Sequence, residues 1–514
     1  MILEKTRNTI RNSFWGTIGN IVTIIFPFAV RTILIKELGS EYLGLNSLFT
    51  SILTVLNITE SGVGSAIVYS MYKPLAEDNT DLICALLNFY KKIYRFMGLL
   101  ILGIGCCLIP FLNYFIHGNV PADISIYILY LLYLANTAVS YWLFAYKNSI
   151  LIIYQRNDIN SKILIVLNVL MYCTQMLILI LTRNYYMYVL VMLLFTICNN
   201  IIPAIYIKKT YPQYVCRGQI SKELKTDIKT NVSGLLMTRI ATITRNSFDS
   251  IIISAFLGLT AVAVYNNYYY IMNALARLLL VFTTSISAGI GNSISTNTPE
   301  KNLEDMRIIN FWYIWIAGWF TVCLGCLYQP FMQIWVGKSF MLSDSVMWMC
   351  ALYFLVSRVT EIQGQYFDAA GLWWLRRWYS MAEVIANIIL NICLGYYFGI
   401  PGIILATIMT IFFINFLGSA RIIFKNYYKH GLKAYLQEQA YYICITAGVA
   451  FTTWIICKAI LFTDTTPGLY MTLFVRAIIC IVIPNVLFLL IYKRTRMFRK
   501  AYPWLKHRLK ITHG

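Results

Sequence analysis

The chain has 514 residues, of which 59% are hydrophobic and 12% are charged, and its formal net charge is +21. Soluble domains carry about 25% charged residues, so this composition excludes a soluble globular protein and indicates a polytopic membrane protein. The basic residues fall mostly in short loops between apolar segments. We therefore assign the positive charge to membrane topology and expect no nucleic-acid partner.

Hydropathy predicts about fourteen membrane-spanning helices after a short basic amphipathic segment, so the expected fold class is all-α. The predicted limits are 13–35, 43–70, 93–114, 123–146, 163–182, 185–207, 232–257, 261–290, 308–329, 344–367, 378–398, 401–424, 440–461 and 469–492. The first apolar segment is longer than the apolar core of a signal peptide and lacks a small-residue cleavage site. We expect it to remain as a membrane helix.

Lysine and arginine gather in alternate connections between the predicted spans, which is the pattern of cytoplasmic loops. The basic residues of these connections are Lys73, Lys91, Lys92, Arg95, Lys147, Arg156, Lys162, Lys208, Lys209, Arg217, Lys222, Lys225, Lys229, Arg376, Arg377, Arg421, Lys425, Lys429 and Lys433. The intervening connections carry few, such as Lys36, Arg183 and Lys338. Only the inner loop 291–307 lacks a clear basic excess. Both termini are therefore predicted to be cytoplasmic.

The longest inner connection, residues 208–231, is basic and follows six spans, so it is interpreted as a linker between two lobes. The first lobe is predicted to cover residues 1–207 and the second residues 232–430. Weak internal similarity across the linker favours parallel repeats, which would place a cavity between the lobes near the membrane midplane. Residues 431–514 then contain two additional helices and a basic cytoplasmic tail.

A polar stripe runs along the seventh predicted span. Its members fall within about 120° of one another on a helical wheel, and they are Arg239, Thr242, Arg245, Asn246 and Asp249. A charged residue at the centre of a lipid-facing helix costs roughly 2.5–3.5 kcal/mol, so the stripe must face protein or water. We interpret it as the wall of a cationic cavity. Alternatively, Arg245 and Asp249, one turn apart, neutralise each other in a packed interface.

A second stripe lies on the second predicted span and consists of Thr50, Thr54, Asn57, Glu60, Ser61 and Gly64. Glu60 has no basic residue one helical turn away. Such a carboxylate can exchange a proton or bind a cation. An ion pair with an arginine of span seven or eight is an equal alternative.

Other charged residues within the spans complete the set. Arg277 lies near the middle of span eight and is a further candidate for the cavity. Arg31 lies near the outer end of span one, where lining the cavity and snorkelling to the surface are equally favoured. Arg358 and Glu361 are three residues apart in span ten, and we expect them to form an internal ion pair.

The sequence offers no clear metal or catalytic motif. The chain has four histidines and no HExxH motif. Cys323 and Cys326 form a CxxC within an apolar segment, without a second Cys or His pair, so we interpret them as core packing. We expect no metal, no cofactor and no enzymatic activity.

Several sequence runs resemble those of bacterial polysaccharide flippases of the O-antigen and capsule type, in the multidrug/oligosaccharidyl-lipid/polysaccharide (MOP) exporter superfamily. The runs similar to the family's first hairpin are EYLGLN (41–46), ESGVGSA (60–66) and YKPLA (72–76). Those similar to its seventh and eighth helices are DSIIIS (249–254), LG (257–258), YNNY (265–268) and SAGIGN (287–292). The resemblance extends over most of residues 8–430.

The resemblance implies a V-shaped, MATE-like bundle of two six-helix lobes with alternating access, in the bacterial cytoplasmic membrane. Its implied cargo is an undecaprenyl-diphosphate-linked oligosaccharide, moved from the inner to the outer leaflet. Arg239, Arg245 and Arg277 match the family's cationic cavity, and Arg31 matches less closely. Asn57, Thr242 and Asn246 would line that cavity, and Glu60 or Asp249 would couple transport to an ion or form an ion pair.

The implied partners are membrane lipids and other polysaccharide assembly proteins, such as a polymerase and a chain-length regulator. Two other functions are alternatives. A multidrug or cation antiporter of the same superfamily should have an acidic or neutral cavity, which the arginines disfavour. A membrane polymerase or ligase usually carries catalysis on a large outer loop, whereas the outer connections here are short.

Overall fold

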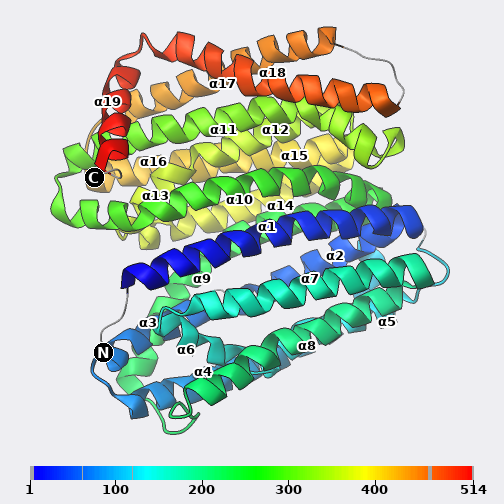
Figure 1. Ribbon diagram of the computed structural model, residues 1–514, viewed down its shortest axis with the longest axis vertical. Helices are drawn as coiled ribbons and strands as arrows, with labels where there is room; N and C mark the ends of the chain where they lie inside the picture. The colour runs from blue at the N-terminus through cyan, green and yellow to red at the C-terminus, as the bar shows by residue number, and fades with distance from the viewer. Residues whose placement is uncertain (1–4, 61, 119, 461–465, 512–514) are drawn as a thin grey trace. The chain divides into compact units, whose positions relative to one another are not determined.

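The computed structural model describes residues 5–60, 62–118, 120–460 and 466–511, and the described residues form helices and connections with no β-strand. This confirms the all-α prediction. By its internal contacts the chain forms two compact units, Met1–Ala263 and Val264–Gly514, and each is described by itself below (Figure 1).

The first unit contains mainly long helices. They are α1 (Lys5–Glu37), α2 (Ser40–Leu56), the 3-10 turn η1 (Asn57–Glu60), α3 (Val63–Ala76), α4 (Thr80–Leu108), η2 (Ile109–Phe115), α5 (Ile126–Trp142), η3 (Ala145–Lys147), α6 (Asn148–Ile153), α7 (Asn157–Thr182), α8 (Tyr185–Thr210) and α9 (Lys222–Leu257), and α10 (Leu259–Thr296) begins within it.

Neighbouring helices of the first unit pack along much of their length. α1 lies along α7, and α7 along α8, as the blue, cyan and green ribbons of Figure 1 show. α4 packs on α5, and α2 and α3 pack on α9. Large apolar side chains such as Leu34, Phe49 and Ile67 fill the interior and are fully buried. This interior fixes the helices that carry the polar residues of the unit.

The second unit comprises the rest of α10 and the helices that follow. These are α11 (Pro299–Trp335), η4 (Lys338–Phe340), α12 (Asp344–Val359), α13 (Glu361–Ala369), α14 (Trp373–Phe398), α15 (Ile400–Met409), the π-helical turn η5 (Thr410–Phe416), α16 (Leu417–Ile423), the π-helical turn η6 (Phe424–Tyr428), α17 (Leu432–Ala459), α18 (Thr466–Tyr492) and α19 (Arg496–Ile511).

α11 is the central helix of the second unit and packs against α12, α17, α18 and α19. Aromatic rings join several of these helices, because Phe311 of α11 contacts Tyr492 of α18 and Phe498 of α19. The Trp312 indole of α11 also donates a hydrogen bond to the Ala501 carbonyl of α19, at 3.3 Å. The amphipathic helix α19 is thus held on α11 by its apolar face.

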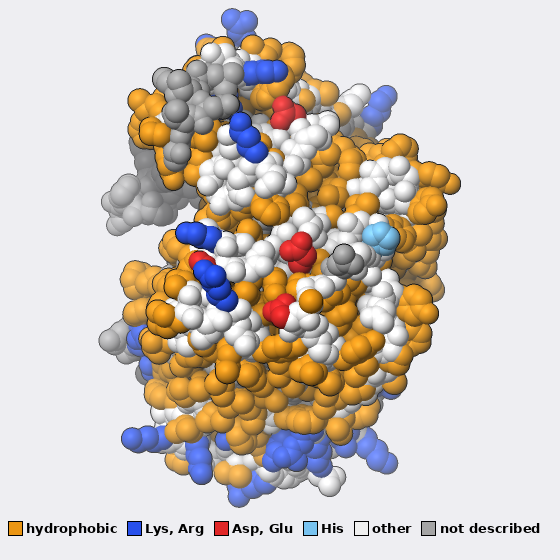
Figure 2. Space-filling view, turned by 90° about the vertical axis from the view of Figure 1, so that its right-hand side faces the viewer, with side chains coloured by type: hydrophobic (Ala, Val, Ile, Leu, Met, Phe, Trp, Pro, Cys, Tyr) orange, Lys and Arg blue, Asp and Glu red, His pale blue; other side chains and the backbone are white. Residues whose placement is uncertain are grey.

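Among the described residues, 11 helices are long and apolar enough to cross a membrane, or 12 if the pair Ile126–Trp142 and Ala145–Ile153, bent by 42°, is one span. Many large apolar side chains of these helices are exposed, such as Trp378 and Ile389 of α14, and hydrophobic side chains cover much of the face in Figure 2. A surface of this kind suits contact with lipid. These features confirm a multi-pass membrane protein.

Two of the fourteen predicted spans are missing even from the count of 12, and both carry polar stripes. Span 43–70 corresponds to α2, η1 and α3, and span 232–257 corresponds to part of α9. Both are helical over most of their length, yet neither is counted as an apolar span. A helix that faces a polar interior needs less apolar surface than one surrounded by lipid. The exact number of fourteen stays a prediction.

The predicted boundary between the two lobes falls within α9. The predicted second lobe begins at residue 232, within α9, whereas α9 packs on α2 and α3 and belongs to the first unit. Contacts therefore divide the chain between residues 263 and 264. The six-plus-six arrangement of lobes, with its linker at 208–231, remains a prediction about topology.

Candidate functional site

The second predicted span is interrupted in its middle. α2 ends at Leu56, the η1 turn covers Asn57–Glu60, and α3 begins at Val63. Gly62 has a φ of 107°, a left-handed conformation that favours glycine because a Cβ would clash there. Irregular backbone at membrane depth is tolerated only where it is buried in protein or lines a water-filled cavity. The interruption, with Glu60 at its edge, therefore faces the interior of the first unit.

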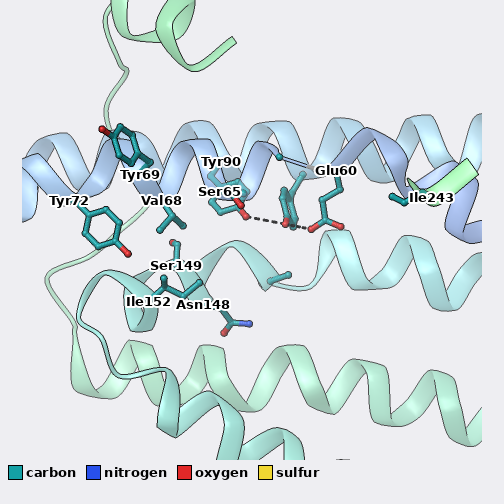
Figure 3. A pocket seen from close by; sticks show the side chains of 14 residues that line it. Glu60, Ser65, Val68, Tyr69, Tyr72, Tyr90, Asn148, Ser149, Ile152 and Ile243 are labelled. Carbon is teal, nitrogen blue, oxygen red and sulfur yellow. Dashed lines mark hydrogen bonds between the residues drawn. The ribbon is translucent and has the colours of Figure 1, made fainter. Parts of the chain in front are cut away.

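Glu60 accepts hydrogen bonds from tyrosines of two other helices. Tyr141 of α5 donates to Oε2 at 2.8 Å, and Tyr94 of α4 donates to Oε1. Tyr90 donates in turn to the Tyr94 hydroxyl at 3.0 Å. The Tyr141 hydroxyl also lies 3.1 Å from Oδ1 of Asn57. The dashed lines in Figure 3 follow the hydrogen bonds from Tyr90 to Glu60.

These tyrosines were not anticipated from the sequence. Glu60 was expected either to be a lone carboxylate or to pair with an arginine, and among the described side chains its partners are phenol hydroxyls instead. Tyr94 and Tyr141 lie 34 and 81 residues away in the chain. The only local signal was the spacing of Tyr90 and Tyr94, which places them one helical turn apart on α4.

Glu60 borders a cavity of about 760 Å³ within the first unit. Other polar lining residues are Ser65, Tyr69, Tyr72, Asn148 and Ser149. In Figure 3, Tyr69 and Tyr72 lie at one end of the cavity and Glu60 at the other. Gly64 also lines it, and a Cβ there would lie 2.5 Å from the Tyr90 hydroxyl, so a side chain at this position would displace the tyrosine. Hydroxyl, amide and carboxylate groups of this kind can bind a polyhydroxylated group or a cation.

α9 carries the predicted polar stripe and reaches the same cavity through Ile243. Asp249 is 1% exposed, and Arg245, one turn earlier, is partly buried. A buried carboxylate is expected where a helix faces protein rather than lipid. The side chains of the remaining members, Arg239, Thr242 and Asn246, lie outside the described residues. Their position in a cationic cavity therefore stays a prediction.

The other two arginines belong to different helices. Arg31 of α1 is partly buried in the first unit, and its charge acts on the hydroxyl of Tyr188 in α8. Two of its guanidinium nitrogens are inaccessible to solvent, which does not favour snorkelling to the membrane surface. Arg277 lies on α10 in the second unit, where its side chain is exposed. The structure thus brings Glu60 and Asn57 together, and it describes Arg31 and Arg277 within separate units.

Solved structures with a similar fold include membrane transporters and a flippase. The lipid II flippase MurJ, in an inward closed conformation, has a TM-score of 0.66 at 16% identity, over 94% of this chain and 99% of that one. An inward-facing multidrug resistance MATE family transporter of the MOP superfamily has a TM-score of 0.64 at 13% identity, over 80% and 95%. A MOP superfamily transporter from Pyrococcus furiosus has a TM-score of 0.56 at 13% identity, over 83% and 96%.

The fold is therefore that of the MOP superfamily transporters, as predicted. Residues 9–287 match the family described as polysaccharide biosynthesis protein. The chain belongs to this polysaccharide biosynthesis protein family. No curated protein sequence matches it. Family and fold together support a flippase or transporter of a lipid-linked compound.

Proposed function

We propose that the protein is a flippase for an undecaprenyl-diphosphate-linked oligosaccharide, which it moves from the inner to the outer leaflet of the cytoplasmic membrane. The surface polysaccharide made from this unit would be an O-antigen or a capsule. The observation that carries the proposal is the charged stripe of α9, with Asp249 buried, in a chain of the polysaccharide biosynthesis family. A helix of this kind suits a polar, charged cargo rather than an apolar one.

Arginine is the residue suited to the diphosphate of such a cargo, because its guanidinium pairs bidentately with phosphate oxygens. Arg239, Arg245 and Arg277 are proposed to provide these contacts, and Arg31 to add to the positive field. With a cytoplasm at negative potential, outward movement of an anion is favoured by roughly 2.3 kcal/mol per charge per 100 mV. The polyprenyl tail can remain in lipid throughout.

The cavity beside Glu60 would serve the coupling of transport or the hydrated sugars. Its carboxylate and tyrosine hydroxyls can hold a proton or a cation, and we propose that Glu60 or Asp249 couples cargo movement to an ion. Asn57, Thr242 and Asn246 would line the polar path. Access would alternate between the two sides of the membrane as the lobes rearrange.

The proposed setting is the bacterial cytoplasmic membrane, with both chain termini in the cytoplasm. The basic loops support this orientation, since positive residues are retained on the cytoplasmic side. A polymerase and a chain-length regulator would use the delivered unit at the outer leaflet, so they are the expected protein partners.

The decisive test is the leaflet distribution of lipid-linked oligosaccharide in cells that lack the protein. We expect the oligosaccharide to accumulate on the inner leaflet and to be redistributed when the gene is restored. If the unit reaches the outer leaflet but is not polymerised, a polymerase or ligase is supported instead. If neither distribution nor polymer changes while drug sensitivity rises, an antiporter is supported.

The cationic site is tested in the same assay by Arg239→Ala and Arg277→Ala. Each variant should fold normally and lose transport, because one bidentate phosphate contact disappears. Arg183→Ala is the matched control, since Arg183 is 71% exposed and pairs with Glu37 at the end of α1. Normal export by both cavity variants would reject the cationic-site mechanism.

A further inference from the structure

Three cysteines meet inside the second unit, one from each of three helices. Cys326 of α11, Cys457 of α17 and Cys480 of α18 have sulfur atoms that all lie within 4.8 Å of one another. Their exposed fractions are 2%, 1% and 0%. None of the three takes part in a disulfide. The cluster is not apparent from the sequence, because Cys326 lies more than a hundred residues before the other two cysteines, which belong to different helices.

The spacing of the three sulfur atoms suits a shared metal ion. Metal–thiolate bonds of about 2.3 Å in a trigonal plane place the sulfurs about 4.0 Å apart. The three sulfur atoms lie within 4.8 Å of one another, so small side-chain rotations would bring them to this spacing. A disulfide, by contrast, joins two cysteines and would leave the third thiol unused.

The donor set selects the kind of ion. The group consists of three cysteine sulfurs, and no other His, Asp, Glu or Cys among the described residues belongs to it. Structural zinc sites almost always have four ligands, whereas soft thiolates also select Cu(I). A three-coordinate, closed-shell, thiophilic ion therefore fits best. From this geometry we propose that the Cys326–Cys457–Cys480 cluster binds one Cu(I) ion.

A nearby cation supports the charge of such a complex. Arg476 of α18 lies one helical turn before Cys480, and its positive charge acts on the Cys457 thiol. Its Nη2 donates a hydrogen bond to the Ile460 carbonyl at 3.3 Å, at the end of α17. Thiols lose protons when they coordinate a metal, so the bound complex is anionic. Arg476 offsets part of this negative charge.

The bound ion would fasten α17 and α18 to α11. In lipid, helices gain no hydrophobic driving force from association, so specific links between them carry more weight. Cys480 of α18 already contacts α11. Its carbonyl accepts a hydrogen bond from the Trp319 indole at 2.7 Å and lies 4.0 Å from the Cys323 thiol. The ion would add a direct bond from each of the three helices at this point.

The test is a Cu(I) titration of the purified full-length protein in detergent, under anaerobic reducing conditions, against a chromophoric Cu(I) chelator. We expect one tightly held Cu(I) per chain. Cys457→Ser and Cys480→Ser should each weaken Cu(I) binding by more than roughly 100-fold. Loss of a group that only hydrogen-bonds to a metal ligand weakens binding by no more than about that factor. Cys350→Ser is the matched control, since Cys350 is also buried, on α12, and lies outside the cluster.

Two further measurements on the wild-type protein do not depend on whether the variants fold. X-ray absorption of the loaded protein should show copper with three sulfur ligands, and Cu(I) should raise the Tm. The assignment would be overturned if copper were bound by fewer than three sulfurs, or if the wild-type protein bound Cu(I) no more tightly than Cys457→Ser. It would also be overturned if the protein retained Zn(II) in preference to Cu(I). So would mass spectrometry that finds two of the three cysteines joined by a disulfide.

Discussion

Two carboxylates of the first unit have opposite surroundings. Asp158, at the start of α7, is fully buried and faces three cations: Arg11 at 2.6 Å, Arg156 at 3.1 Å and Lys162 at 3.9 Å. Glu60 accepts hydrogen bonds from tyrosine hydroxyls and borders an open cavity.

This difference indicates a structural role for Asp158 and a functional role for Glu60. Arg11 of α1 pairs with Asp158 of α7, and the backbone amide of Asp158 donates to the Asn12 side chain at 2.7 Å, so these contacts fix two helices to each other. The hydroxyls around Glu60 leave its charge uncompensated among the described side chains. A carboxylate of that kind can exchange a proton or take a cation, whereas Asp158 is already neutralised.

Among changes at these two carboxylates and their partners, the largest effect on transport is expected for Glu60→Gln. The amide keeps the shape but removes the charge, and the loss of interactions with a charged group is worth about 1.5–3 kcal/mol. Transport of lipid-linked oligosaccharide should fall roughly 10- to 100-fold, with unchanged amounts of folded protein on size exclusion. Unchanged transport by Glu60→Gln would mean that this carboxylate has no part in coupling.

Asp158→Asn should act on stability instead. It leaves Arg11 and Arg156 without their counter-charge, and we expect the free energy of unfolding to fall by about 2 kcal/mol. The Tm measured in detergent should decrease, while transport per folded molecule stays close to wild type. A variant with wild-type Tm and lost transport would reverse the roles assigned to the two carboxylates.

Tyr94→Phe and Tyr141→Phe should each have a moderate effect. Each removes one hydrogen bond to Glu60 and keeps the ring, so transport should fall about fivefold, which corresponds to about 1 kcal/mol. Tyr130→Phe is the control, because its hydroxyl bonds to the Gly105 carbonyl and not to Glu60. Equal losses in all three variants would point to a packing effect.

Lys162→Ala should have the smallest effect. Lys162 is 42% exposed and lies 3.9 Å from Asp158, and exposed ion pairs contribute about 0.5 kcal/mol. The Tm should therefore change far less than in Asp158→Asn. A decrease as large as that of Asp158→Asn would show that Lys162, rather than the arginines, holds the carboxylate.

Local spacing explains which features could be predicted from the sequence. The ion pair between Arg358 and Glu361 was expected because the residues are one helical turn apart, and it is found at 3.7 Å. Apolar segments of sufficient length likewise located the membrane helices, each near its observed position. Both signals lie within a few turns of one helix.

Features that depend on contacts between helices could not be predicted. The interruption after Leu56 was missed because Asn57, Glu60 and Ser61 fit the polar stripe of a continuous helix, although Gly62 and Gly64 were a hint. The tyrosines that bond Glu60 come from α4 and α5, and no spacing rule connects them to η1. The same holds for Cys457 and Cys480, so the CxxC of α11 was interpreted as packing alone.

The docking of α19 on α11 has a practical consequence for reporter fusions. Phe498 packs on Phe311, the Ala501 carbonyl accepts the Trp312 indole hydrogen bond, and Lys500 pairs with Glu304 at 2.5 Å. A fluorescent or enzymatic reporter joined after the last residue leaves these contacts intact. A reporter joined after Tyr492 removes α19 and uncovers the aromatic rings of α11, so its signal would report on an altered second unit.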